Sequence, residues 1–108
     1  MTPAQLAAVS YLARYTGHTH ELYAAALRRW FGWCETNHLD PLAGIQRAHI
    51  ELYIRHLHET GLRDSSINTM MHGVRGFFRF AHIDGVQEHA SLLGIVKALG
   101  QLEDRRFA

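Results

Sequence analysis

Hydrophobic residues recur along the chain with the spacing of an α-helix. In residues 65–80, "SSINTMMHGVRGFFRF", apolar side chains return every three or four positions, which is the period of one helical face. Most other segments of the chain share this period, and none alternates apolar and polar residues as a strand does. We therefore expect an all-α domain, a compact bundle of four helices with a short accessory helix at the C-terminal end.

Residues with capping chemistry set the expected ends of these helices. Thr2 with Pro3 begins the first helix, Thr19 the second, and Asp64 or Ser65 the fourth, while Gly61 ends the third. The five expected helices span about 3–15, 19–37, 47–60, 65–83 and 88–99. We assign residues 1–86 to the bundle and residues 87–108 to the accessory helix and a frayed tail or linker.

One core is expected to unite the apolar faces of these helices. Its expected members are Tyr23, Leu27, Trp30, Ile54, Leu57, Val74, Phe77 and Phe78. A single cysteine excludes an internal disulfide and fits a reducing compartment. We also find no apolar run of membrane-spanning length and no basic-then-apolar leader. The expectation is a soluble, intracellular domain without a membrane partner, a small-molecule substrate or a cofactor.

A polar stripe runs between the apolar positions of residues 65–80. Its members are Ser65, Asn68, Thr69, His72, Arg75 and Arg79. Hydroxyl, amide, imidazole and guanidinium groups form hydrogen bonds with both the phosphates and the base edges of nucleic acids. A helix face that meets only water is usually richer in Glu and Lys, which this stripe lacks. A solvated face and a DNA contact therefore both remain open, and the net charge of +1 does not decide between them.

Two glycines, Gly73 and Gly76, lie between the polar and apolar stripes and allow two interpretations. A missing side chain lets another backbone approach closely, and that backbone could belong to a neighbouring helix or to a nucleic acid.

Signals for catalysis and metal binding are weak. No Gly-x-Ser-x-Gly turn presents a nucleophile, and we interpret Cys34 as a buried, inert thiol. Among nine histidines, the closest pairs are two residues apart, which places their rings on different sides of a helix rather than at the spacing of helical metal ligands. We expect no metal site.

Three segments in order carry a family resemblance. The first is a helix with Thr19, Tyr23, Leu27, Trp30, Trp33 and Cys34; the others read "IQRAHIELYIRHLHETG" and "SSINTMMHGVRGFFRFAHIDGV". This order resembles the N-terminal core-binding domain of the tyrosine recombinases, the phage-integrase family, over roughly residues 6–86. The resemblance implies a SAM-like fold, in which the four helices form two crossed helical hairpins.

The resemblance also implies a function. The domain would be one jaw of a clamp around double-stranded DNA during integration or recombination, with its second and fourth helices toward the major groove. Other recombinase protomers on the DNA would be further partners. Carried over by position, the DNA-contacting residues would be Thr19, Arg28, Ser65, Ser66 and Thr69, and the helical spacing adds Asn68, His72 and Arg75.

The family's catalytic Arg, His-x-x-Arg, His and Tyr belong to a separate domain that follows the jaw and is absent from these 108 residues. We therefore expect the domain by itself not to be an enzyme, and its implied location is the cytoplasm, with the nucleoid. A helical protein-interaction module without DNA binding is an alternative. It is favoured by the near-zero net charge and by Thr69 and Met70, where relatives often carry Arg or Lys. A metalloenzyme with histidine ligands is a third possibility.

Overall fold

The structure is a computed structural model that describes residues 1–83. Four helices make up this part of the chain: α1 (Pro3–Leu12), α2 (Gly17–Thr36), α3 (Arg47–Glu59) and α4 (Asp64–Ile83). Residues 1–83 contain no strand, which confirms the all-α class. The expected accessory helix at 88–99 and the rest of residues 87–108 lie outside the described residues. Across residues 1–83, every helix is too short or too polar to span a membrane.

The helix ends follow the capping chemistry with three differences. α4 begins at Asp64 itself, so Asp64 and Ser65 lie inside the helix and the prediction of either as its cap is wrong. As expected, Thr2 caps α1: its Oγ1 accepts a hydrogen bond from the Gln5 backbone N–H at 3.1 Å, and the Gln5 side chain accepts one from the Thr2 N–H. However, α1 ends at Leu12 rather than near Tyr15. The cap of α2 is Thr16, whose extended backbone ends the preceding connection, so the prediction of Thr19 as the cap is wrong.

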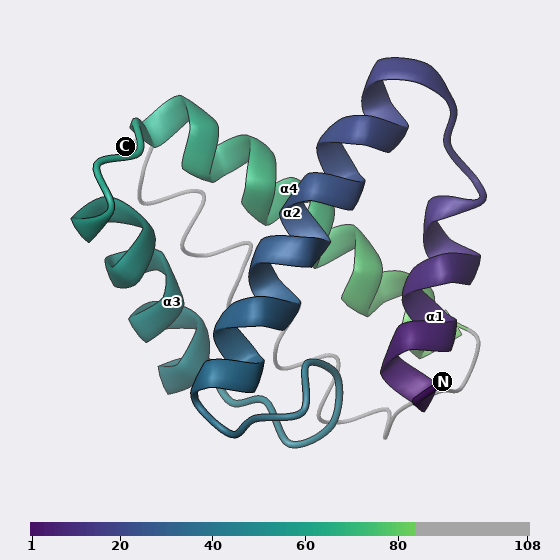
Figure 1. The fold of residues 1–108 in the computed structure, drawn as a ribbon, viewed down its shortest axis with the longest axis horizontal. Coiled ribbons are helices and arrows are strands. Elements are labelled where there is room, and N and C mark those ends of the chain that lie inside the picture. Colours follow the sequence, from purple (N-terminus) through teal and green to yellow (C-terminus); the bar gives the residue numbers. More distant parts are fainter. Residues whose placement is uncertain (84–108) are drawn as a thin grey trace.

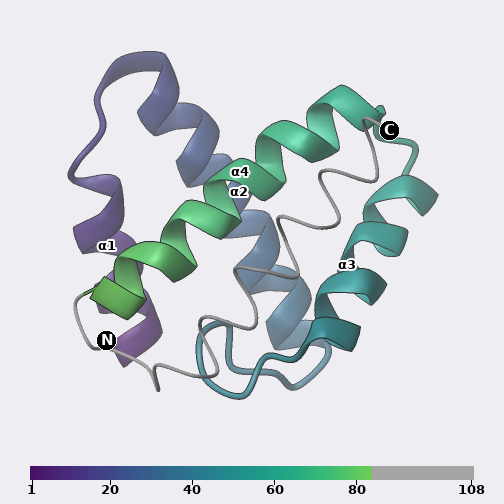
Figure 2. The ribbon, with the colours of Figure 1, turned by 180° about the vertical axis from the view of Figure 1, so that it is seen from behind.

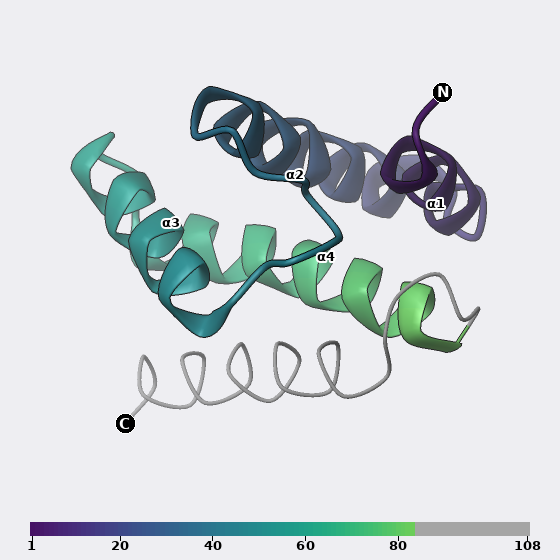
Figure 3. The same cartoon turned by 90° about the horizontal axis from the view of Figure 1, so that it is seen from below.

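The helices form two layers that cross (Figures 1 and 2). Figure 3 shows α1 and α2 in one layer, with α4 passing beneath them. The crossing of α2 and α4 is close because α4 has no side chain at Gly73. A Cβ atom there would lie 3.2 Å from Tyr23 Cδ1 and 3.3 Å from Ala26 Cβ. Gly73 therefore serves the packing of two helices and not the approach of a nucleic-acid backbone.

Gly76 has the same role against α1. A Cβ atom at this position would meet the hydroxyl of Tyr11, and the ring atom Cζ of Tyr11 would be 3.1 Å away. Tyr11 itself is buried against Phe77 of α4. Both glycines of the fourth helix are thus explained by helix contacts, which leaves the exposed polar side chains as the candidates for binding.

The core is centred on Trp30 of α2, whose side chain is fully buried. Its ring centroid lies 4.9 Å from that of Tyr53 in α3 and 6.2 Å from that of Phe78 in α4. The indole N–H donates to the Pro41 carbonyl at 2.9 Å, which ties the loop after α2 to the core. Of the expected core residues, all are buried except Tyr23 and Ile54, which are half-buried.

Cys34 lies on the inner side of α2 and is fully buried. Burial, with a smaller effect of the Asp40 carboxylate, raises the pKa of its thiol from 9.0 to about 12. Burial also raises the pKa of Tyr53 and, with the neighbouring Tyr15, that of Tyr11. All three groups therefore hold their protons more tightly in the folded protein than in the unfolded chain.

These shifts predict a loss of stability in alkaline solution. Above pH 9 the unfolded chain releases the Cys34 proton while the folded chain keeps it until about pH 12, so the free energy of unfolding falls as pH rises through this window. Urea unfolding at neutral pH and at about pH 10.5 measures the fall. Cys34→Ala should show a shallower fall than the wild type. A wild-type stability that stays constant or rises would contradict the prediction.

Candidate nucleic-acid interface

Within residues 1–83, the crossing of α2 and α4 leaves one angle between the two helices without a neighbouring helix. α1 packs between the N-terminal half of α2 and the C-terminal half of α4, where Tyr11 lies parallel to Tyr23 with centroids 6.1 Å apart and faces Gly76. α3 packs between the C-terminal half of α2 and the N-terminal half of α4, where Tyr53 contacts Trp30. Figure 1 shows no other helix of residues 1–83 between the two N-terminal halves.

Five of the predicted DNA-contacting residues are exposed on these two N-terminal halves. Thr19 lies one turn before Tyr23, and Thr69 lies one turn before Gly73, so each is about 6 Å along its helix from the crossing. We use the name α2/α4 surface for the exposed side chains of Thr19, Ser65, Ser66, Thr69 and His72. None of them is acidic, and Glu21 of α2 lies almost half a turn around the helix from Thr19.

The backbone adds positive potential to this surface, because both helices begin there. The first turn of a helix carries free N–H groups and a partial positive charge. Thr16, the cap of α2, makes no side-chain hydrogen bond to these groups. At the start of α4, the carboxylate of Asp64 lies 2.9 Å from Nε2 of His58 at the end of α3. The free N–H groups at the start of α2 favour an anion there, whereas the first turn of α4 already carries the Asp64 carboxylate.

Local hydrogen bonds hold three side chains of the polar stripe, those of Thr69, His72 and Arg75. The Thr69 hydroxyl donates to the Ser65 carbonyl at 3.0 Å, one turn back on α4. The Arg75 guanidinium donates to Nδ1 of His72 at 3.1 Å. Arg75 is half-buried, so it lies at the edge of the exposed stripe and reaches the α2/α4 surface through His72.

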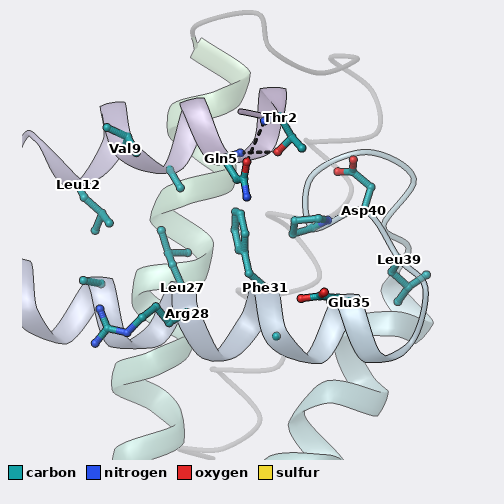
Figure 4. Close-up of a pocket in the computed structure, with 14 residues that line it drawn as sticks. Thr2, Gln5, Val9, Leu12, Leu27, Arg28, Phe31, Glu35, Leu39 and Asp40 are labelled. Carbon is teal, nitrogen blue, oxygen red and sulfur yellow. Dashed lines mark hydrogen bonds between the residues drawn. The ribbon is translucent and has the colours of Figure 1, made fainter.

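Arg28 does not belong to the α2/α4 surface. It follows Thr19 by nine positions, about two and a half helical turns, and so projects from the opposite side of α2. There it lines a groove between α1 and α2 (Figure 4). The expected grouping of Arg28 with the residues of the fourth helix is therefore not found.

Asn68 was expected in the exposed stripe, and this expectation needs correction. Its side chain is only 7% exposed, and its Oδ1 has no hydrogen-bond partner among residues 1–83. The reason is its position, three residues before the buried Met71, which turns it toward the apolar face of α4. A buried amide cannot reach a duplex without local rearrangement.

Arg29 is a cation near this region that the predicted set omits. It is exposed, and it lies within about a quarter of a turn of Thr19 around α2. Its charge partly offsets the effect of burial on the pKa of Tyr53, which places it on the side of α2 that faces α3. From the sequence alone, the helical spacing from Thr19 favours Arg29 over Arg28 as the cation on the same side of α2.

The groove between α1 and α2 has a volume of about 710 Å³ and a mainly apolar wall (Figure 4). Val9, Leu12, Leu27 and Phe31 line it, and Arg28 and Glu35 flank it along α2. In the part of the chain that the structure describes, no three His, Cys, Asp or Glu side chains converge as a metal site requires. The groove offers apolar contact, one basic side chain and, with Asp40, two acidic ones.

Comparison with known proteins gives consistent matches. The family described as phage integrase, N-terminal SAM-like domain, matches over residues 9–85. Tyrosine recombinase XerC of Pseudomonas fluorescens is 24% identical over 84 residues, which are 78% of this chain and 28% of that protein. The XerC protein of Stutzerimonas stutzeri strain A1501 is 24% identical over 86 residues, 80% of this chain and 29% of that protein. No solved structure gives a significant match.

The chain thus spans less than a third of the length of the curated relatives it matches. The matched family describes their N-terminal domain and not a catalytic one. The match includes the last part of α1 and all of α2, α3 and α4, and it covers well over half of the 108 residues. The protein therefore belongs to the tyrosine recombinase family through a phage-integrase N-terminal SAM-like domain.

Proposed function

We propose that this domain binds double-stranded DNA through the α2/α4 surface and acts as the non-catalytic jaw of a tyrosine recombinase during integration or recombination. The observation that carries the proposal is the exposed set of hydroxyl and imidazole groups around the open angle between α2 and α4. Such groups contact phosphates and base edges. This role would place the protein in the cytoplasm, with the nucleoid.

The start of each helix supports the same proposal. A net charge of +1 is low for a DNA-binding protein, but the local potential matters more than the total charge. The N-terminal ends of α2 and α4 border the same surface. The first turn of α2 carries no acidic side chain, and Asp64 in the first turn of α4 is paired with His58. On the outer side of α3, by contrast, acidic and basic residues alternate and pair, as Arg47 with Glu51 and Arg55 with Glu59.

Thr69→Glu tests the proposal, and the chain offers a matched control. Thr36 near the end of α2 is exposed and donates its hydroxyl to the Gly32 carbonyl at 3.1 Å, as Thr69 does to Ser65. Thr69→Glu should weaken binding of a fluorescent mixed-sequence duplex about tenfold, through a lost contact and phosphate repulsion. Thr36→Glu should change the affinity less than about twofold.

The dependence of affinity on salt gives a second readout from the same titrations. If the domain neutralises about four phosphates, log K falls against log salt concentration with a slope of about −4. Thr69→Glu should reduce the magnitude of this slope, and Thr36→Glu should leave it unchanged. Equal effects of the two substitutions, or an affinity that does not fall with salt, would contradict the proposed surface.

A protein-contact surface on α1 is a second candidate, and one observation favours it. α1 contains no charged residue, and its Leu6 and Val9 side chains are 58% and 55% exposed. Together with the apolar groove beside α2, this side of the domain is suited to contact with other recombinase protomers on the DNA. It lies on the far side of α2 from Thr19, so both contacts can occur in one molecule.

A further inference from the structure

Leu22 is an exposed apolar side chain beside the polar side chains of the α2/α4 surface. It is 38% exposed, and no other large apolar side chain is exposed among the described side chains of α2 and α4. The remaining exposed large apolar residues, Met1, Leu6, Val9 and Leu52, lie on or before α1 or on α3. Single exposed leucines are common on proteins, so the position of Leu22 decides its meaning.

That position is at the open angle between the two helices. Leu22 precedes Ala26 by one turn on the same row of α2, and Ala26 is one of the two residues that pack against Gly73 of α4. It also follows Thr19 by three residues, so the two side chains are neighbours on the helix surface. Leu22 therefore lies just beyond the point where α2 and α4 separate, beside the hydroxyl groups of the α2/α4 surface.

We propose that Leu22 contacts the 5-methyl group of thymine in the major groove and gives the domain a preference for thymine-containing sites. This inference rests on the proposed DNA contact of the α2/α4 surface. Of the groups that base pairs present in the major groove, the thymine methyl is the apolar one, and it is read by apolar side chains. The neighbouring Thr19 and Thr69 hydroxyls supply hydrogen bonds, which a methyl group cannot accept or donate.

Uracil provides a direct test, because it lacks only that methyl group. An alternating A–T duplex and the same duplex with uracil in place of thymine are titrated against the domain by fluorescence anisotropy. The wild type should bind the thymine duplex about fourfold more tightly. This factor corresponds to the free energy gained when one additional carbon, the thymine methyl group, is buried against Leu22. Leu22→Ala should bind both duplexes equally. Leu52→Ala, which truncates an exposed leucine on α3, should keep the wild-type preference.

The outcomes separate this inference from the proposed function. Binding of both duplexes with equal affinity by the wild type would overturn the role of Leu22 and leave DNA binding intact. A thymine preference that persists in Leu22→Ala would also overturn it, because the difference would then come from the duplex itself. Absence of binding to either duplex would overturn the proposed function and this inference together. The far-ultraviolet circular dichroism of each variant checks that the helices are retained.

Discussion

Replacing Trp30 by alanine is expected to lower the free energy of unfolding by about 3–5 kcal/mol, a large part of the stability of a small domain. The indole is fully buried and contacts aromatic rings of two other helices, Tyr53 of α3 and Phe78 of α4. Its removal leaves a cavity where α2, α3 and α4 meet. It also leaves the Pro41 carbonyl without its hydrogen-bond donor.

Urea unfolding followed by circular dichroism measures the effect of this substitution. Trp30→Phe is the control, because it keeps an aromatic ring in the site and removes only part of the volume and the N–H donor. It should destabilise the domain clearly less than Trp30→Ala does. A change of less than about 1 kcal/mol in Trp30→Ala would show that Trp30 is not the centre of the core.

Gly76→Val is expected to destabilise the domain by about 1–3 kcal/mol, because the new side chain overpacks a close helix contact. Its Cβ would collide with the hydroxyl end of Tyr11. Tyr11 has little room to move, since its ring is buried and is surrounded by the rings of Tyr15, Phe77 and Phe80. The strain therefore has to be taken up by a shift of α1 against α4.

Two further variants make this prediction specific. Gly32 lies within α2, and a Cβ there would have no atom within 4 Å, so Gly32→Val should change stability by no more than about 0.5 kcal/mol. Tyr11→Phe removes the hydroxyl that the new Cβ would meet. Combined with Gly76→Val, it should cost less than the sum of the two single changes. Full additivity, or an equal loss at Gly32, would argue against the contact.

Most of the fold could be predicted from the sequence, because it depends on local rules. The apolar period fixed the faces of the helices, and the Thr2 cap and the left-handed backbone of Gly61 are short-range features. The start of α2 was misplaced because several residues near it, among them Thr16 and Thr19, can cap a helix. The role of Gly73 and Gly76 was ambiguous because a close approach depends on which helix lies opposite.

The sequence predicts which kinds of side chain the candidate site exposes. It predicts less well which of these side chains lie close together. The exposed hydroxyls of Ser65, Ser66 and Thr69 lie together because they share one helix. Arg28 does not lie beside Thr19, because a separation of nine positions places the two side chains on opposite sides of α2. Burial of Asn68 could not be read from its polarity, since it occupies the boundary between the two faces of α4. That Leu22 lies at the α2/α4 surface becomes apparent only once the crossing of α2 and α4 is known.

Both tryptophans of the chain, Trp30 and Trp33, lie in one place. Their rings stack with centroids 5.7 Å apart, and both contact Tyr53. Indole fluorescence is therefore an unlabelled reporter of the place where α2, α3 and α4 meet. An unfolding curve recorded from it describes that part of the domain, and a separation between this curve and the loss of helical signal would reveal that α1 comes apart at a different denaturant concentration.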